Sequence, residues 1–200
     1  MTPLTLDVTS VSQVEQAASE VATLDVLINN AGIARYEDLS NLDAIEQHLA
    51  VNLFGMFKVT RAFLPLLRRS KGAIVNNLSL ATLAALPVIP AYSISKAAAF
   101  NMTQSLRALL AGQGVTVHAV VLGPIDTDMN RGFEIPKASP ESAAAAHLRW
   151  VGKRRRRDLS RPRVPVHRRG LAHWRSQGAR APVRSFRAGK RGDSCVTSLR

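Results

Sequence analysis

Tyr92 and Lys96 are the two residues whose types and spacing suggest chemistry most clearly. They stand four positions apart in Tyr-Ser-Ile-Ser-Lys, at the start of a segment with helical character, so both side chains are expected on one face of a helix. A cation close to a phenol favours the phenolate and lowers a pKa that is ordinarily about 10. Tyr92 is therefore a candidate general acid or base near neutral pH. An isolated Tyr-x-x-x-Lys is a weak motif, and its surroundings decide its meaning.

Polar residues also occur at the ends of successive apolar runs, which are the segments that indicate buried strands. Ser79 follows one such run and precedes Tyr92 by 13 positions. Asn52 lies within a predicted helix, an unfavourable place for a side chain that competes with the helix backbone. It either belongs to a site or only kinks the helix and anchors the sheet. Two further polar segments follow apolar runs, namely Asn29-Asn30-Ala31-Gly32 and Gly123-Pro124-Ile125-Asp126-Thr127.

Bringing these residues together requires strands and helices that alternate along the chain. Apolar runs predict strands at residues 4–7, 26–28, 73–78 and 115–122, and helical spacing predicts helices at 11–22, 42–68 and 92–111. Such alternation is typical of βαβ units in a parallel, doubly wound α/β sheet. The site of such a fold lies at the carboxyl ends of its strands, where the polar segments are placed.

In order and spacing, these motifs resemble the short-chain dehydrogenase/reductase family over roughly residues 4–140. The resemblance implies a Rossmann-like fold and an NAD(P)-dependent oxidoreductase that transfers hydride between nicotinamide and an alcohol or carbonyl substrate. Tyr92 would exchange the proton with the substrate oxygen, and Lys96 would lower the Tyr92 pKa and bind the nicotinamide ribose. Ser79 would hold the substrate oxygen, and Asn52 would position a water in the proton relay.

The same resemblance implies a set of cofactor contacts and no metal site. The implied contacts are Asp7 at the adenine ring, Asn30, Ala31 and Gly32 beside the adenosine, and Ile125 and Thr127 at the carboxamide, together with Tyr92 and Lys96. Thr127 has the alternative interpretation of a helix N-cap. The turn before it begins Leu122-Gly123 where the family usually has Pro-Gly. Family members commonly form homodimers or homotetramers, so the same is expected here.

The start of the sequence departs from the family pattern. A dinucleotide site uses a glycine-rich turn between the first strand and its helix, where backbone amides hold the pyrophosphate. Only 28 residues precede Asn29-Asn30-Ala31-Gly32, and none forms this turn. By resemblance residues 4–7 match the third strand, so the first two strands and the last strand are expected to be missing from an incomplete sheet. We therefore expect impaired cofactor binding and turnover, and the choice between NAD and NADP is not readable.

Charge divides the chain into two parts. Residues 1–148 carry 10 Lys and Arg against 12 Asp and Glu, a net of −2, whereas residues 149–200 carry 17 against 2, a net of +15. Beyond about residue 147, arginine runs mixed with proline and glycine show no apolar periodicity, which is typical of disorder. The expected organisation is a partial domain at residues 1–146 and a basic, disordered tail at 147–200. A shifted reading frame in GC-rich DNA would produce such arginine runs.

Two functional hypotheses follow. The first is the short-chain oxidoreductase acting on a small alcohol or carbonyl compound. The second is a non-catalytic remnant whose basic tail binds polyanions or nucleic acid non-specifically; no nucleic-acid motif accompanies the tail, so specific recognition is not expected. The lone Cys195 cannot build a disulfide framework, and neither a secretory signal nor a run of roughly 18 apolar residues is apparent. A cytoplasmic location without membrane attachment is therefore expected.

Overall fold

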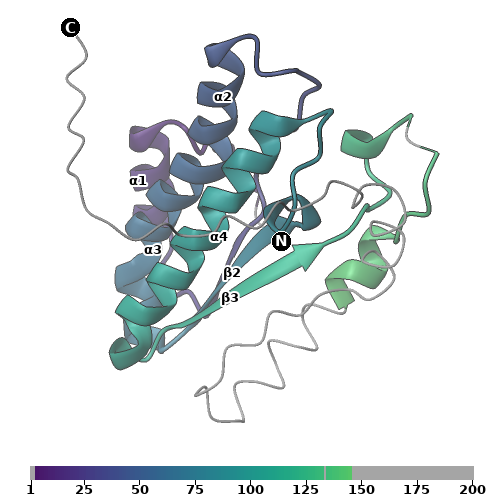
Figure 1. Ribbon diagram of the computed structural model, residues 1–200. Coiled ribbons are helices and arrows are strands. Elements are labelled where there is room, and N and C mark those ends of the chain that lie inside the picture. The colour runs from purple at the N-terminus through teal and green to yellow at the C-terminus, as the bar shows by residue number, and fades with distance from the viewer. Residues whose placement is uncertain (1–2, 133, 146–200) are drawn as a thin grey trace, which may run out of the picture.

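Figure 1 shows the computed structural model of the protein, which describes residues 3–132 and 134–145. In chain order the main elements are α1 (Val11–Glu20), β1 (Val26–Asn29), α2 (Leu42–Leu49), a π-helix (Ala50–Gly55), α3 (Met56–Ser70), β2 (Ala73–Ser79), α4 (Pro90–Leu110) and β3 (Thr116–Leu122). Short 3₁₀ turns occur at Leu80–Thr82, Ala111–Gln113 and Asp128–Asn130, and residues 140–145 are helical. The expected basic tail lies outside the described residues.

The three strands form a parallel sheet in the order β1-β2-β3. Ile28 of β1 is paired with Val75 of β2, which is paired in turn with His118 of β3. Helical crossovers join these parallel neighbours, as a parallel sheet requires. The predicted Rossmann-like α/β class is therefore confirmed, and the strands predicted at 26–28, 73–78 and 115–122 begin or end within a residue or two of the observed ones.

The predicted strand at Leu4–Asp7 is wrong. These residues have no strand pairing in the structure, because a strand needs a partner for its backbone groups and β1 pairs only with β2 among the described strands. Leu6 and Val8 instead pack as half-buried side chains against the main hydrophobic cluster. Within the predicted strand, Leu6 therefore contributes to packing and not to strand pairing.

The hydrophobic core lies between the sheet and one layer of helices. Side chains of Ile74 and Val117 point from neighbouring strands toward Phe63 and Leu67 of α3, in a cluster closed by Leu110 at the end of α4. Alternate residues of a strand face the same side, so Leu78 of β2 and Ala119 and Val121 of β3 form a second cluster on this face, with Ala99 of α4. Figure 1 shows α3 and α4 side by side over this face. The helices thereby fix where α4 begins, which is the end that carries Tyr92.

The stretch Leu42–Ser70 is one long helix interrupted by the π-helix. By length and composition alone it satisfies the criterion for a membrane span, and 39% of its most apolar window is buried within the protein. Its buried residues in α3, such as Val59 and Leu67, pack into the core between helix and sheet, which is how an amphipathic core helix behaves. The single predicted helix at 42–68 is confirmed, but the π-turn around Asn52 was not foreseen.

A buried polar network crosses the core between the helices. The Asn29 amide donates to Thr60 Oγ1 at 3.0 Å and to Asn76 Oδ1 at 2.8 Å. The Asn76 amide in turn donates to Thr103 Oγ1 at 2.9 Å, and Thr103 donates to the carbonyl of Ala99 at 2.7 Å. All four polar side chains are buried, and each one has a partner, as buried polar groups require. The network fixes β1 and β2 relative to α3 and α4.

Candidate active site

The first turn of α4 places Tyr92, and a carboxylate from another loop holds this turn in place. Pro90 is the first residue of α4, where no N–H is needed for a hydrogen bond within the helix. Ile89 supplies no side-chain cap, and the Glu37 carboxylate accepts from the Ala91 N–H at 2.6 Å instead. A negative charge at a helix N-terminus is stabilising. Glu37 is a positioning residue that nothing in the local sequence pattern indicated.

Ser79, Tyr92 and Lys96 meet at the carboxyl end of β2, as predicted. Lys96 Nζ lies 5.7 Å from the centroid of the Tyr92 ring and donates to the backbone carbonyl of Asn77 at 3.0 Å. Ser79 hydrogen-bonds with the Tyr92 side chain, while its Oγ accepts from the Ala81 N–H at 3.2 Å. A hydroxyl, a phenol and an ammonium therefore converge on one place.

Burial dominates the titration of both ionisable groups at this place. Burial raises the pKa of Tyr92 above its ordinary value, and the hydrogen bond with Ser79 lowers that pKa only in part. Burial lowers the pKa of Lys96 to about 8. The downward shift of the Tyr92 pKa that the sequence predicted is therefore wrong for the protein alone, because burial is the largest influence on this pKa and raises it.

The serine hydrogen bond gives a first testable prediction. In a Tyr36→Phe background Tyr92 is the sole tyrosine, so absorbance near 295 nm follows its ionisation. Replacing Ser79 with alanine is expected to move this ionisation to still higher pH, because the bond that opposes the effect of burial is lost. Ser105→Ala is the matched control, because it removes a serine hydroxyl from an exposed position of α4, the helix that carries Tyr92. An unchanged or lower ionisation midpoint in the Ser79 variant would contradict the assigned contact.

Asn52 lies in the π-helix with its side chain buried and its amide donors both in use. Its Oδ1 accepts from the Ile33 N–H at 2.9 Å, and its Nδ2 donates to the Ile33 carbonyl at 3.0 Å and to Ser95 Oγ at 2.9 Å. Asn52 therefore ties the loop after β1 to α4. Single π-turns are frequent at functional sites, and this geometry favours a positioning role for Asn52 over a direct part in a relay.

Glycine at position 32 is explained by the same close approach. A Cβ atom on Gly32 would lie 3.2 Å from Asn52 Oδ1 and 3.5 Å from Lys96 Nζ. The first of these distances is tighter than an ordinary side-chain contact. Gly32 thus leaves room beside the ammonium, and its contact with a cofactor stays a prediction.

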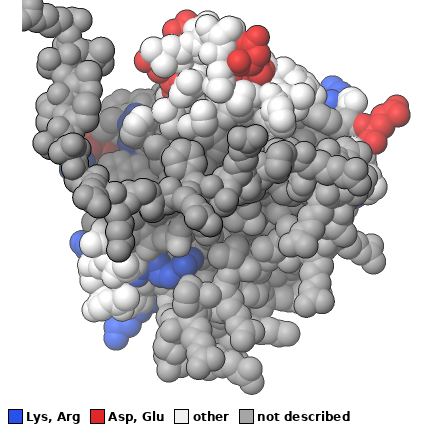
Figure 2. Space-filling model, in the orientation of Figure 1, with Lys and Arg blue, Asp and Glu red and all other residues white. Residues whose placement is uncertain are grey.

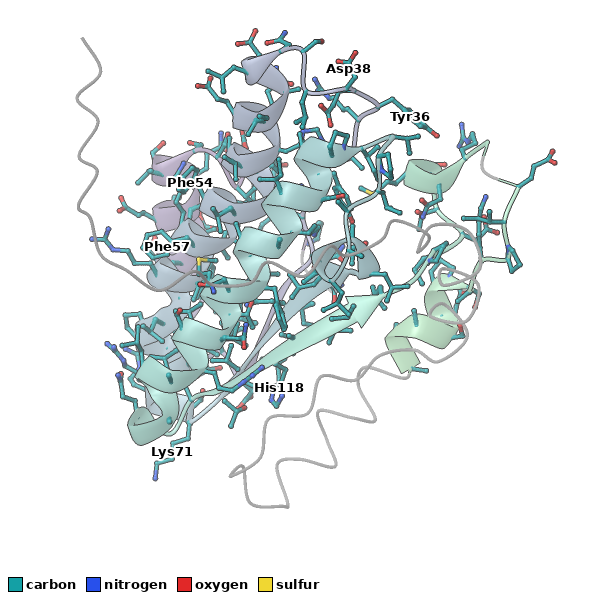
Figure 3. All side chains as sticks on the ribbon, viewed as in Figure 1. Tyr36, Asp38, Phe54, Phe57, Lys71 and His118 are labelled. Atoms are coloured by element: carbon teal, nitrogen blue, oxygen red, sulfur yellow. The ribbon has the colours of Figure 1, made fainter. Side chains whose placement is uncertain are left out.

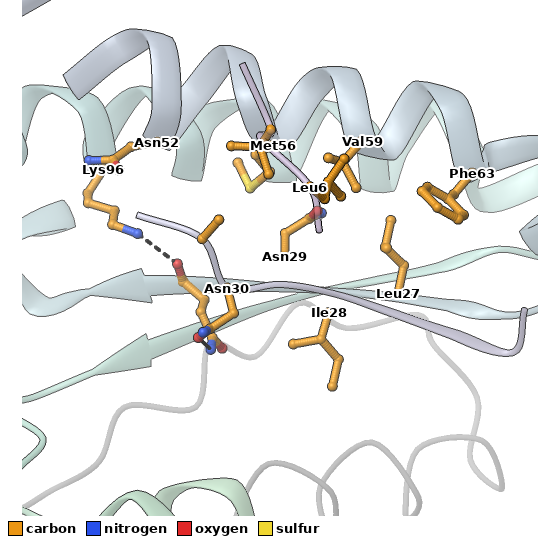
Figure 4. A pocket seen from close by; sticks show the side chains of 13 residues that line it. Leu6, Leu27, Ile28, Asn29, Asn30, Asn52, Met56, Val59, Phe63 and Lys96 are labelled. Carbon is orange, nitrogen blue, oxygen red and sulfur yellow. Dashed lines mark hydrogen bonds between the residues drawn. The ribbon is translucent and has the colours of Figure 1, made fainter. Parts of the chain in front are cut away.

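Figure 4 shows a cavity with Asn52 and Lys96 at one end and Phe63 at the other. Its volume is about 340 Å³. The polar end includes the predicted contacts Asn30 and Ala31. The lining residues are Leu6, Val8, Leu27, Ile28, Asn29, Asn30, Ala31, Asn52, Met56, Val59, Phe63, Asn77 and Lys96. The cavity thus runs from Lys96 along β1.

The remaining predicted contacts do not line this cavity. Asp7 is exposed, and its carboxylate accepts from the N–H and the hydroxyl of Thr9, each at 2.8 Å; these bonds lower its pKa. Ile125 forms a parallel bridge with Ala138. Thr127 precedes the 3₁₀ turn at Asp128–Asn130 in the capping position but makes no side-chain cap. The cofactor roles of Asp7, Ile125 and Thr127 stay predictions.

Sequence reasoning missed three further residues that hold the site. Asn77 supplies the carbonyl for Lys96 and donates through its side chain to Asn30 Oδ1 at 2.6 Å. Ser95 bonds both Asn52 and the Tyr92 carbonyl, the latter at 2.7 Å. The His48 ring makes a T-shaped contact with the Tyr92 ring. The position of His48, one helical turn before Asn52, was the available signal for it.

In an open parallel α/β sheet, ligands bind outside the carboxyl ends of the strands, which is where Ser79, Tyr92 and Lys96 lie. Residues 1–137 match the family model described as short chain dehydrogenase, and the chain belongs to this family.

Relatives and solved structures agree with that membership. The chain is 36% identical over 135 residues to 2-(S)-hydroxypropyl-CoM dehydrogenase 3 of Xanthobacter autotrophicus, covering 66% of this chain and 53% of the relative. It is 35% identical over 135 residues to estradiol 17-beta-dehydrogenase 2 of Rattus norvegicus, covering 63% and 35%. A short chain dehydrogenase from Burkholderia cenocepacia in complex with NADP has a TM-score of 0.73 at 35% identity, covering 88% of this chain and 73% of that one. The chain thus spans about half or less of these two relatives.

Proposed function

We propose that the protein is an NAD(P)-dependent oxidoreductase that transfers hydride between nicotinamide and a small alcohol or carbonyl substrate. The convergence of Ser79, Tyr92 and Lys96 at the carboxyl end of β2 carries this proposal. Membership of the short chain dehydrogenases and the NADP-bound structural neighbour support it. The second neighbour of this kind is a gluconate 5-dehydrogenase from Burkholderia cenocepacia with NADP and tartrate, with a TM-score of 0.60 at 32% identity over 63% of this chain and 52% of that one.

Each site residue is proposed to have a separate role in proton exchange with the substrate. Tyr92 is the group proposed to exchange a proton with the substrate oxygen, since its phenol is neutral over the physiological range. Ser79 contacts that phenol and is placed to hold the same oxygen. Lys96 holds positive charge beside the ring at neutral pH, which favours any negative charge that develops on Tyr92 during transfer. Asn52 keeps the loop after β1 against α4.

The residues present fit the nicotinamide ribose end of the cofactor. Lys96 Nζ lines the cavity with Asn30 and Ala31, and an ammonium has three donors, of which the Asn77 carbonyl takes one. When bound, the cofactor supplies hydride exchange at its nicotinamide ring. The segments that join β1 to α2 and β2 to α4 contain Gly32 as their only glycine, so neither is a glycine-rich turn of the kind that holds a pyrophosphate. The proposal includes either NAD or NADP.

The polyanion-binding alternative is not favoured. Its basis is the basic segment at residues 147–200, which lies outside the described residues, and the comparisons assign residues 1–137 to an oxidoreductase family. The described residues carry 10 basic and 12 acidic side chains. Figure 2 shows acidic side chains gathered at the end of the molecule where α2 begins. No attraction to phosphate is expected from that end.

A homodimer or homotetramer in the cytoplasm completes the proposal. Figure 3 shows Phe54 and Phe57 close together on the outside of the long helix, where they are 51% and 44% exposed. Neighbouring large apolar side chains at the surface are typical of a protein contact. The single thiol, Cys195, agrees with a reducing compartment. Analytical ultracentrifugation that found only monomer would contradict the oligomer.

Cofactor binding is the direct test of the proposed function. Titration of the full chain into NADH and NADPH, followed by nicotinamide fluorescence, is expected to show saturable binding to at least one of them. Lys96→Gln is expected to weaken that binding about 10- to 100-fold, since charge-assisted hydrogen bonds contribute about 1.5–3 kcal/mol. Lys71→Gln is the matched control, because Lys71 is exposed and lies at the far end of the sheet in Figure 3. No response to either nucleotide would remove the activity and leave the family membership standing.

A further inference from the structure

His48, at the end of α2, is a buried polar side chain whose two ring nitrogens both have partners. It is fully buried. Nδ1 lies 2.6 Å from the carbonyl oxygen of Ala44, and Nε2 lies 3.1 Å from the backbone nitrogen of Arg35. A carbonyl only accepts and a backbone N–H only donates, so Nδ1 must carry the proton and Nε2 must accept. The surroundings therefore select one neutral tautomer.

The same ring also makes a T-shaped contact with the Tyr92 ring. The ring centroids are 6.5 Å apart and the ring planes are inclined by 76°. This is the edge-to-face arrangement that aromatic pairs prefer, because the positive edge of one ring faces the negative face of the other. His48 thus restricts the orientation of the Tyr92 ring in the first turn of α4.

His48 and Asn52 are four residues apart along the helix, and they act on the same two segments. On the loop after β1, Asn52 holds both backbone groups of Ile33, and His48 holds the N–H of Arg35. On α4, Asn52 bonds Ser95, and His48 contacts Tyr92. The two side chains form a clamp between the loop and the helix that carries the phenol. We call them the His48–Asn52 clamp.

An apolar residue would fill the same volume without the cost of burying two polar nitrogens. It would leave the Arg35 N–H without this acceptor. An aliphatic residue would also present no aromatic ring to Tyr92. Histidine at position 48 is therefore a specific solution that combines an acceptor, a donor and an aromatic ring in one side chain.

We infer that His48 is a positioning residue for Tyr92, which sets the orientation of the phenol ring and holds the loop at Arg35 against α4. This role rests on the proposed function of Tyr92 as the proton-exchanging group. His48 is proposed to act through Tyr92, without contact to the substrate or the reacting atoms.

Two variants separate the two halves of this role. His48→Phe keeps an aromatic ring beside Tyr92 and loses the acceptor for Arg35, whereas His48→Gln offers an acceptor and loses the ring. Both are made in the Tyr36→Phe background, so that absorbance near 295 nm reports Tyr92 alone. Gln47→Ala is the matched control, since it removes the bond from α2 to the Arg35 side chain and leaves the His48 ring in place.

The expected results are opposite for the two variants. In His48→Gln the ionisation midpoint of Tyr92 moves down toward its ordinary value, because opening the ring contact lets water reach the phenol. In His48→Phe and Gln47→Ala the midpoint stays where it is. Hydrogen exchange of the Arg35 backbone amide is expected to be fast in His48→Phe, which lacks the acceptor, and slow in His48→Gln, which keeps one.

Equal midpoints in His48→Phe and His48→Gln, with both variants folded by circular dichroism, would overturn the inference. If His48→Gln fails to fold, a Tyr92 midpoint in folded His48→Phe that departs from that of the parent overturns it equally, since this variant keeps an aromatic ring. The titration needs neither cofactor nor substrate. Its failure is therefore distinguishable from failure of the proposed function, which nucleotide binding and turnover report separately.

Discussion

Replacing Tyr92 with phenylalanine is expected to lower kcat of NAD(P)-dependent alcohol oxidation or carbonyl reduction by about 10²- to 10⁴-fold, the usual contribution of a positioned general acid or base. The phenol oxygen is lost, while the ring keeps its packing against His48. Nucleotide affinity, followed by nicotinamide fluorescence, is expected to change little, because Lys96 keeps its bond to the Asn77 carbonyl. Loss of turnover with retained binding is the signature of a group that acts in the transition state.

Tyr36→Phe is the matched control for this loss, because it removes the same hydroxyl from a ring that is 67% exposed. Its kcat is expected to equal that of the unmodified chain. A Tyr92→Phe variant that keeps full activity would show that proton exchange occurs elsewhere, and it would remove the basis of the proposed function. The assay uses several small alcohols and carbonyl compounds with both nucleotides, since the substrate class is set only broadly.

Much of the fold could be predicted because its signals are local. Of the four apolar runs that predicted strands, three became strands of the parallel sheet. The spacing of Tyr92 and Lys96 on one helix face needed only helical geometry. Ser79 required one more step, namely that carboxyl ends of parallel strands share an edge. These steps depend on neighbours in sequence or on the general rules of the α/β architecture.

The parts that could not be predicted depend on contacts between distant segments. Leu4–Asp7 has the composition of a strand, but pairing decides whether a strand forms. Glu37 caps α4 from 54 positions away, and no local pattern marks a residue as the cap of another helix. The direction of the Tyr92 pKa shift is set by how deeply the phenol is buried, which charge spacing along the sequence does not report.

His48 lies between these two cases. Its spacing from Asn52 is visible in the sequence, yet a histidine on a helix is ordinarily a surface or core residue of no special role. Only the packing shows that both nitrogens are engaged and that the ring meets Tyr92. Ser79, Tyr92 and Lys96 could therefore be predicted from a motif, whereas the role of His48 beside them depends on tertiary packing.

Replacing Asn76 with alanine is expected to lower the free energy of unfolding by about 2–5 kcal/mol, the largest effect on stability that we predict. The substitution removes the acceptor for the Asn29 amide and the donor to Thr103, and each buried polar group left unpaired costs about 1–3 kcal/mol. Because Asn76 is fully buried, water cannot replace these bonds without opening the core. Urea denaturation followed by circular dichroism measures the change.

Asn101→Ala is the matched control, since Asn101 is exposed on α4 and a surface substitution of this kind changes stability by about 0.5 kcal/mol or less. A second variant, Thr103→Val, removes the acceptor for the Asn76 amide and leaves Asn76 Oδ1 as the acceptor for Asn29, so it separates the two bonds. If Asn76→Ala is no less stable than Asn101→Ala, the network does not hold β1 and β2 to the helices. The placement of Ser79 at the end of β2 would then depend on the apolar core alone, because Asn76 is the residue of β2 that joins Asn29 on one side to Thr103 on the other.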